Sequence, residues 1–279
     1  MLPWITAEVT VPFDLVAIAA KIVWSAGLVL GLSFLAERVS TRVAGIVAGA
    51  PQNTVLLYFF VGLDMGVEHV VSSTPHGLAS FSATIAFVLA YYFASRACVR
   101  WPAAAGALAG TIVFFAIAAA LSQVHFTLLE AMALTLTVVL VAHWIFKRID
   151  FIAVTAPVRY TPGLLVLRGG IAALFIVASI AAAEILGTRW TGLLTGFPAI
   201  LLPTLLIINI TYGTASTHAI IRNIPLGVTS ILLYILTVPI TFPNFGILGG
   251  TAASLAASLL YLGAIGFAGS RAPIAGKAG

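Results

Sequence analysis

Two stretches decide the fold of this chain: AERVSTRVAGIVAGAP at residues 36–51 and AEILGTRWTGLLTGFP at residues 183–198. Aligned at an offset of 147 residues, they agree at seven positions. The charged agreements are Glu37 with Glu184 and Arg42 with Arg189. Charged residues make up only 8% of the chain, so chance is a poor explanation and we infer an internal duplication.

The duplication extends beyond these stretches. At the same offset Gly66 aligns with Gly213. At an offset that is three residues larger, Pro75 aligns with Pro225. We take the shared motif as A-E-x3-T-R-x2-G-x3-G-x-P.

The composition is that of a membrane protein. Hydrophobic residues make up 61% of the 279 positions, and the mean hydropathy is +1.15. A soluble domain carries roughly three times as many charged residues. Because one crossing of the hydrocarbon core takes about 20 apolar residues, the chain has room for about nine crossings and little else.

We predict an all-α polytopic transmembrane bundle of about nine spans, counted from roughly 20 apolar residues per crossing. The expected helices are 15–36, 43–63, 78–96, 103–122, 127–147, 164–185, 190–211, 224–242 and 245–268. The breaks between them include Asp64 to Pro75, Glu184 to Arg189, Tyr212 to Pro225 and Pro243-Asn244. Residues 1–147 form the first repeat, 148–163 a cytoplasmic connector and 164–279 the second repeat.

The basic residues give the orientation. With the N-terminus outside, eleven Lys and Arg fall on the inner side, and two, Lys21 and Arg189, fall on the outer side. This is a strong positive-inside bias. It orients the chain with its C-terminus in the cytoplasm, and we expect the membrane to be a bacterial or archaeal inner membrane. The net charge of +5 is therefore explained by the basic residues that set the orientation in the membrane, and no Lys/Arg cluster indicates a nucleic-acid partner.

Five spans separate equivalent helices, so the two repeats enter the membrane from opposite sides. Inverted repeats of five and four helices are typical of secondary transporters, whose sites lie where matching helices are interrupted. The alternative is a duplication kept only for packing. Channels also use inverted halves.

The second span of each half holds the candidate substrate site. Proline removes a backbone donor and loosens a helix, and at this depth the freed groups are tolerated only against protein or a water-filled cavity. The predicted site residues are Pro51, Gln52, Asn53 and Thr54 in the first half and Pro198, Pro203 and Thr204 in the second. We expect Gly196-Phe197-Pro198 and Pro203-Thr204 to interrupt the second helix twice. The alternative is that Gly45/Gly49 and Gly192/Gly196 are small-residue contact faces.

The charged residues suggest gates. Glu37/Arg42 and Glu184/Arg189 are candidate latches on opposite faces of the membrane, or else residues that pin the turns between helices. For Lys21 and Arg168 the favoured interpretation is snorkelling to the headgroups. A compact outer group is formed by Asp64, Glu68 and His69. It could hold a cation, although a solvated loop is the favoured interpretation. Glu130 is expected to be exposed to water.

TRVAGIVAGAP at residues 41–51, followed by an apolar helix and Gly66, resembles the GlpM-like family of small bacterial inner-membrane proteins. That family carries an A-G-x-x-P-x-F-P-type second span. The similarity covers the first three spans of each half. It implies a fused, duplicated inner-membrane protein and names no substrate.

The function predicted is secondary transport, by alternating access, of a small polar or anionic solute, with proton coupling as an option. An ion channel is the alternative, and a lipid flippase or lipid-processing enzyme comes third. The expected partners are the lipid bilayer and the solute, and a homodimer stays open. Catalysis, metals and cofactors are not expected, because no HExxH, GxSxG or P-loop pattern is found.

The orientation can be tested with fused reporters. A reporter placed after Lys277 should read cytoplasmic, and a tag placed before Met1 should be accessible from outside. Finding both ends on one side would remove the odd span count and the inverted duplication with it.

Overall fold

The computed structural model describes residues 51–146 and 162–269, together with Ala19, Lys21, Val23, Trp24 and Gly27. Within these residues the protein is all-helical. The elements are α3 (Gln52–Met65), α4 (Val67–Ala97), α5 (Pro102–Ser122), α6 (Leu128–Phe146), α7 (Pro162–Thr195) and α8 (Leu201–Gly269). Five helical stretches are long and apolar enough to cross a membrane, which agrees with a membrane-embedded protein.

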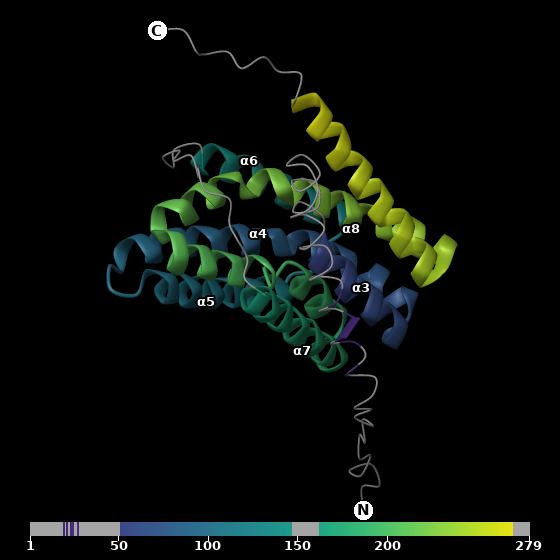
Figure 1. The fold of residues 1–279 in the computed structure, drawn as a ribbon. Helices are drawn as coiled ribbons and strands as arrows, with labels where there is room; N and C mark the ends of the chain where they lie inside the picture. The colour runs from purple at the N-terminus through teal and green to yellow at the C-terminus, as the bar shows by residue number, and fades with distance from the viewer. Residues whose placement is uncertain are drawn as a thin grey trace, which may run out of the picture.

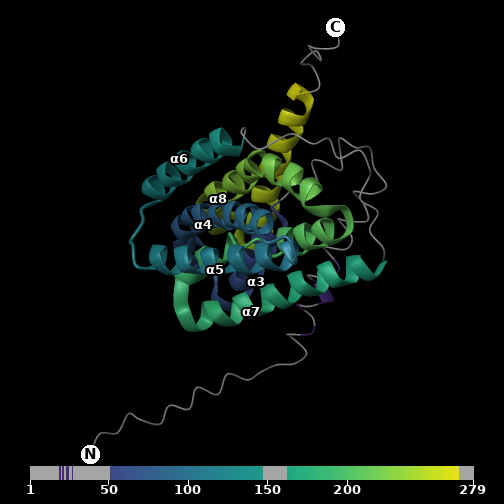
Figure 2. The same ribbon diagram turned by 90° about the vertical axis from the view of Figure 1, so that its left-hand side faces the viewer.

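Helix α4 is the centre of the bundle. It packs against α3, α5, α6, α7 and α8, and in Figure 2 it lies between α6 at one edge and α7 at the other. Of the residues in its most apolar stretch, 61% are buried, against 39% or less in the other four candidate spans. The other four are thus largely free to face lipid.

Four glycines connect helical segments that follow one another without a loop. Gly66, Gly187, Gly213 and Gly246 all have φ between 68° and 88° with ψ within 11° of 180°. L-residues with a Cβ are almost excluded from this backbone region. A Cβ added at any of the four would meet nothing within 4 Å, so the requirement is for the backbone angle and not for space.

These glycines divide the two longest elements. Element α7 comprises the segments 162–186 and 188–195, and α8 comprises 201–212, 214–245 and 247–269. The sharp turn before the last segment is visible where the yellow end of α8 leaves the green part at an angle (Figure 1). Contacts confirm that the chain reverses there. The Thr241 and Ser254 hydroxyls lie 2.7 Å apart, and Ser258 donates to the Ser230 carbonyl at 2.8 Å.

The turns gather at two ends of the bundle. One end, which we call the Gly66 end, holds the turns at Gly66, Gly187 and Gly246 together with the α5–α6 connection. Arg189 bonds to Ser122, His69 bonds to Thr191, and a Cβ on Gly62 would touch Ile247.

The opposite end, which we call the Gly213 end, holds the α4–α5 connection as well. Asn209 donates to the Tyr91 hydroxyl at 3.3 Å, and Ser95 lies 3.1 Å from His218. Arg189 therefore lies at the opposite end of the bundle from Arg96, in the last turn of α4, and from Arg100, in the α4–α5 connection.

Two predicted breaks are shorter than expected. Helix α4 begins directly after Gly66 and continues through Pro75, and the second of the α8 segments begins after Gly213 and continues through Pro225. A proline inside a helix frees the carbonyl four residues earlier. At Pro75 the Thr74 hydroxyl donates to the nearby Val71 carbonyl at 2.7 Å, so that carbonyl has a partner and the helix continues.

Several predictions concern residues outside the described part of the chain. These include Glu37, Arg42, Gly45, Gly49, most of the span 15–36 and nearly all of the connector 148–163. The count of nine spans and the inverted repeats also stay predictions.

The turn glycines can be tested by substitution. Gly66→Ala should lower the free energy of unfolding by about 1–3 kcal/mol, because alanine is strained at this backbone angle. Gly170→Ala is the matched control: it is helical, and its added Cβ would also meet nothing within 4 Å. This change should raise stability by roughly 0.5–1 kcal/mol. Equal effects in detergent unfolding curves would contradict the assignment.

Candidate functional site

The helix predicted over 190–211 is interrupted near its middle. Element α7 ends at Thr195 and α8 begins at Leu201. Tight turns fill the gap: the amides of Gly196 and Phe197 donate three residues back, at 3.3 and 3.1 Å. The second predicted interruption, at Pro203-Thr204, is wrong. Pro203 lies in the first turn of α8, where a missing amide donor breaks no helical bond.

The first half has a helix start at the aligned position. Pro51 precedes α3, and its carbonyl accepts the first helical bond, from the Val55 amide at 2.9 Å. Pro198 does the same for the Leu202 amide at 2.8 Å. The offset of 147 residues pairs the donors as well as the acceptors.

The two helix starts lie side by side, and side chains from the first half occupy the freed carbonyls of the second. The Asn53 amide donates to the carbonyls of Thr195 and Phe197, at 3.3 and 3.1 Å. Thr54 donates to the Thr195 carbonyl at 3.3 Å, and Thr84 of α4 donates to the Gly196 carbonyl at 2.6 Å. We call this set, residues 51–54, Thr84 and 195–198, the central junction.

Close packing supports the junction from α4. A Cβ on Gly192 would collide with the Ser73 carbonyl oxygen, and one on Gly196 would collide with the Ser80 side chain. These glycines therefore serve as the small-residue contact face that the sequence analysis held as an alternative. Packing and helix interruption occur together here.

An aromatic cluster covers the other side of the interruption. Phe197 is 6% exposed, and its ring lies 4.2 Å from Phe175 and 5.1 Å from Phe114, centroid to centroid. Phe115 and Phe87 complete the cluster at 5.5 and 6.4 Å. In this conformation the junction is packed closed.

The predicted substrate residues divide into two groups. Pro51, Asn53, Thr54 and Pro198 are part of the junction, and Gln52 lies half-buried at the start of α3. Pro203 and Thr204 lie one turn further along, and Thr204 donates to the Ile200 carbonyl of its own turn at 2.7 Å.

The predicted latch of the second half is not an ion pair in this conformation. Glu184 is exposed, while the Arg189 guanidinium donates to the Ser122 carbonyl at 2.8 Å and contacts the His125 ring. Among the described residues the salt bridge is Lys21 with Asp64, so snorkelling is not the conformation of Lys21 here.

The outer acidic residues also have definite places. Gly66 separates Asp64, at the end of α3, from Glu68 and His69 on α4, so these residues lie on two helices and the solvated loop favoured from the sequence is wrong. Glu130 is exposed, as expected. It accepts the Thr127 amide and hydroxyl, both at 2.8 Å, and so caps the start of α6.

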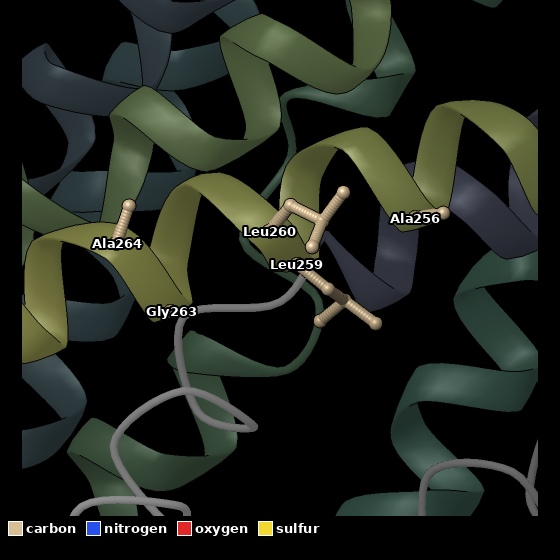
Figure 3. A pocket seen from close by; sticks show the side chains of 5 residues that line it. All are labelled: Ala256, Leu259, Leu260, Gly263 and Ala264. Carbon is tan, nitrogen blue, oxygen red and sulfur yellow. The ribbon is translucent and has the colours of Figure 1, made fainter.

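A groove lies on the last α8 segment, away from the junction. Figure 3 shows the small and aliphatic side chains that line it, namely Ala256, Leu259, Leu260, Gly263 and Ala264. Lacking polar groups, this groove suits lipid chains better than a polar solute.

Sequence reasoning missed Thr84 and the aromatic cluster. A signal for Thr84 was available: Ser73, Gly77, Ser80 and Thr84 are spaced as one face of a helix, and small or hydroxyl residues on such a face indicate close helix contact. For the five phenylalanines there was none, because phenylalanine is common throughout the apolar spans.

Comparison with known proteins adds no relative: no family model, curated protein or solved structure matches this chain. The case for function therefore depends on the chain's own geometry.

The role of Thr84 in the junction can be measured. Thr84→Val keeps the shape but leaves the buried Gly196 carbonyl without that donor, which should cost about 1–3 kcal/mol of unfolding free energy. Thr137→Val is the matched control, because Thr137 is exposed and donates to Ala133 of its own helix. A loss no greater than that of the control would show that the bond contributes little.

Proposed function

We propose that the protein is a secondary transporter that moves a small polar or anionic solute by alternating access, with the central junction as its site. The observation that carries this proposal is the meeting of two aligned helix starts, at Pro51 and Pro198, bridged by Asn53. Interrupted helices at corresponding positions of two halves are a recurring feature of transport sites.

Matching backbone geometry supports the inverted repeat behind this proposal. Gly66 and Gly213, which the sequence repeat aligns, have φ of 88° and 84° and ψ of 169° and 172°. The segment after each glycine continues through a proline, Pro75 or Pro225. The Gly66 and Gly213 turns also lie at opposite ends of the bundle, as an inverted relation requires.

The hydrogen bonds that close the junction could be replaced by hydrogen bonds to a solute. Asn53, Thr54 and Thr84 belong to the first half, and the carbonyls that they contact belong to the second. A separation of the halves would free amide and hydroxyl donors together with carbonyl acceptors, all at one place. A solute with several hydrogen-bonding groups could replace each lost bond, so opening would not leave them unsatisfied.

The direction of the helices favours a solute with negative character. Both α3 and α8 begin at the junction and α7 ends there, so the positive ends of two helix dipoles meet the negative end of one. In transporters with interrupted helices such ends face the anionic groups of substrates. The sides of the membrane follow the basic residues: we propose that the Gly66 end is outside and the Gly213 end cytoplasmic, in a bacterial or archaeal inner membrane.

Cysteine accessibility tests this function without a known substrate. In a Cys98→Ser background, Asn53→Cys should react with a membrane-impermeant thiol reagent applied from either side of oriented vesicles, slowly in each case. Alternating access exposes the junction to each side in turn. Leu140→Cys is the control for a site facing lipid, since Leu140 is 70% exposed on α6, and it should not react from either side.

The outcomes separate the candidate functions. An Asn53→Cys variant whose thiol stays unreactive from both sides indicates a junction kept for packing alone and overturns the proposal. Fast labelling from both sides together with ion conductance in planar bilayers indicates a channel instead.

A further inference from the structure

Arg189 holds a cationic group at the Gly66 end that lacks a counterion among the described residues. It lies two residues after the Gly187 turn and is half-buried. The Nη1 atom donates to the Ser122 carbonyl at 2.8 Å, and Nη2 lies 3.0 and 2.6 Å from the two ring nitrogens of His125. The first partner is an uncharged carbonyl and the second is an imidazole, so neither supplies a negative charge.

The acidic residues that the structure describes at this end do not pair with it. Asp64 pairs with Lys21, and Glu130 is engaged with Thr127. Glu184 and Glu68 are exposed, and neither has an oxygen within 4 Å of Arg189. A partly buried charge without a partner is unfavourable, and an anion relieves it.

Imidazole groups lie on the side of Arg189 that faces the α5–α6 connection. His125 contacts the guanidinium, and His76 lies 3.1 Å from the Val124 carbonyl, on the connection that also carries His125. The contact of His69 with Thr191 lies apart from these groups, because residues two apart on a helix do not face each other. The guanidinium has five N–H donors, and the contacts that the structure shows engage two of its nitrogens.

We propose that this cluster, Arg189 with His76 and His125, is a binding site for an oxyanion, a carboxylate or a phosphate. The planar fork of arginine matches the two oxygens of such groups. The oxyanion could come from a soluble solute or from a phospholipid headgroup, and both would present the same chemistry to Arg189.

The position of the cluster relates it to transport, on the assumption that the proposed function holds. Six helical residues separate Arg189 from Thr195 of the central junction, which is about 9 Å at 1.5 Å per residue. An anion held at Arg189 therefore lies at the outer mouth of the proposed path. If the oxyanion belongs to the solute, the transported solute is an anion.

Binding can be measured on the purified full-length chain in a phospholipid-free detergent. With Trp4, Trp24, Trp101 and Trp144 replaced by Phe, Trp190 next to Arg189 reports on the site. Sodium sulfate, phosphate and citrate are titrated against sodium chloride at equal ionic strength. We expect a saturable fluorescence change that Arg189→Gln weakens at least tenfold and that Arg96→Gln, at the opposite end, leaves unchanged.

A second arm tests the lipid source. The same proteins are placed in nanodiscs of phosphatidylcholine with and without phosphatidylglycerol. A response to soluble anions identifies a solute site, and a response to phosphatidylglycerol alone identifies a headgroup site; either supports the oxyanion cluster. Should Arg189→Gln fail to fold, Arg189→Lys keeps the charge without the fork and should also bind more weakly.

No saturable response in either arm, or an equal response in the Arg189 variants, overturns the oxyanion site. The result is separable from the proposed function, because labelling of Asn53→Cys uses no anion. Labelling of Asn53→Cys from both sides without anion binding would support the transport proposal and overturn the oxyanion site. Anion binding without labelling would support an anion site on a protein that does not transport.

Discussion

Inside a bilayer, every backbone amide and carbonyl must find its partner within the protein, because the hydrocarbon offers none. The architecture described here follows from that requirement. The helix interrupted at residues 196–200 frees carbonyls deep in the bundle, and Asn53, Thr54 and Thr84 bond to them. Where Pro75 frees a carbonyl inside α4, a hydroxyl in the same turn compensates.

The same requirement explains the turns. A loop of several residues would expose unpaired backbone groups near the membrane surface, whereas a single glycine with positive φ lets one helix follow another almost directly. Gly66, Gly187 and Gly246 bring three such turns to one end of the bundle, together with the α5–α6 connection. The polar side chains of His69, His125 and Arg189 consequently gather at that end.

Function is proposed from the way these two regions combine. The central junction pairs exchangeable polar groups across the two halves, and the Arg189 cluster lies about 9 Å from it along the helix, at 1.5 Å per residue. Between them runs the segment 188–195, whose Gly192 packs directly on α4. A shift of this segment along α4 would alter the junction and the cluster together. Transport of an anion would make use of both regions. The need to satisfy freed carbonyls accounts for the donors of the junction, but it does not account for a guanidinium that has no counterion among the described residues.

How much the sequence determined by itself depends on the range of the interactions concerned. Hydropathy predicted the apolar helices of a membrane-embedded protein. Gly66, Gly187, Gly196-Phe197-Pro198 and Gly213 all fall within the predicted breaks, because helix ends are governed by local backbone chemistry. Pro75 was wrongly expected to lie in a break between two helices, since the hydroxyl that supports it becomes evident only in the folded turn. The bonds of Asn53 to residues 195 and 197, of Arg189 to Ser122 and of Lys21 to Asp64 join positions 43 to 144 residues apart. Local chemistry cannot specify such distant contacts, and only the tertiary packing around α4 decided them.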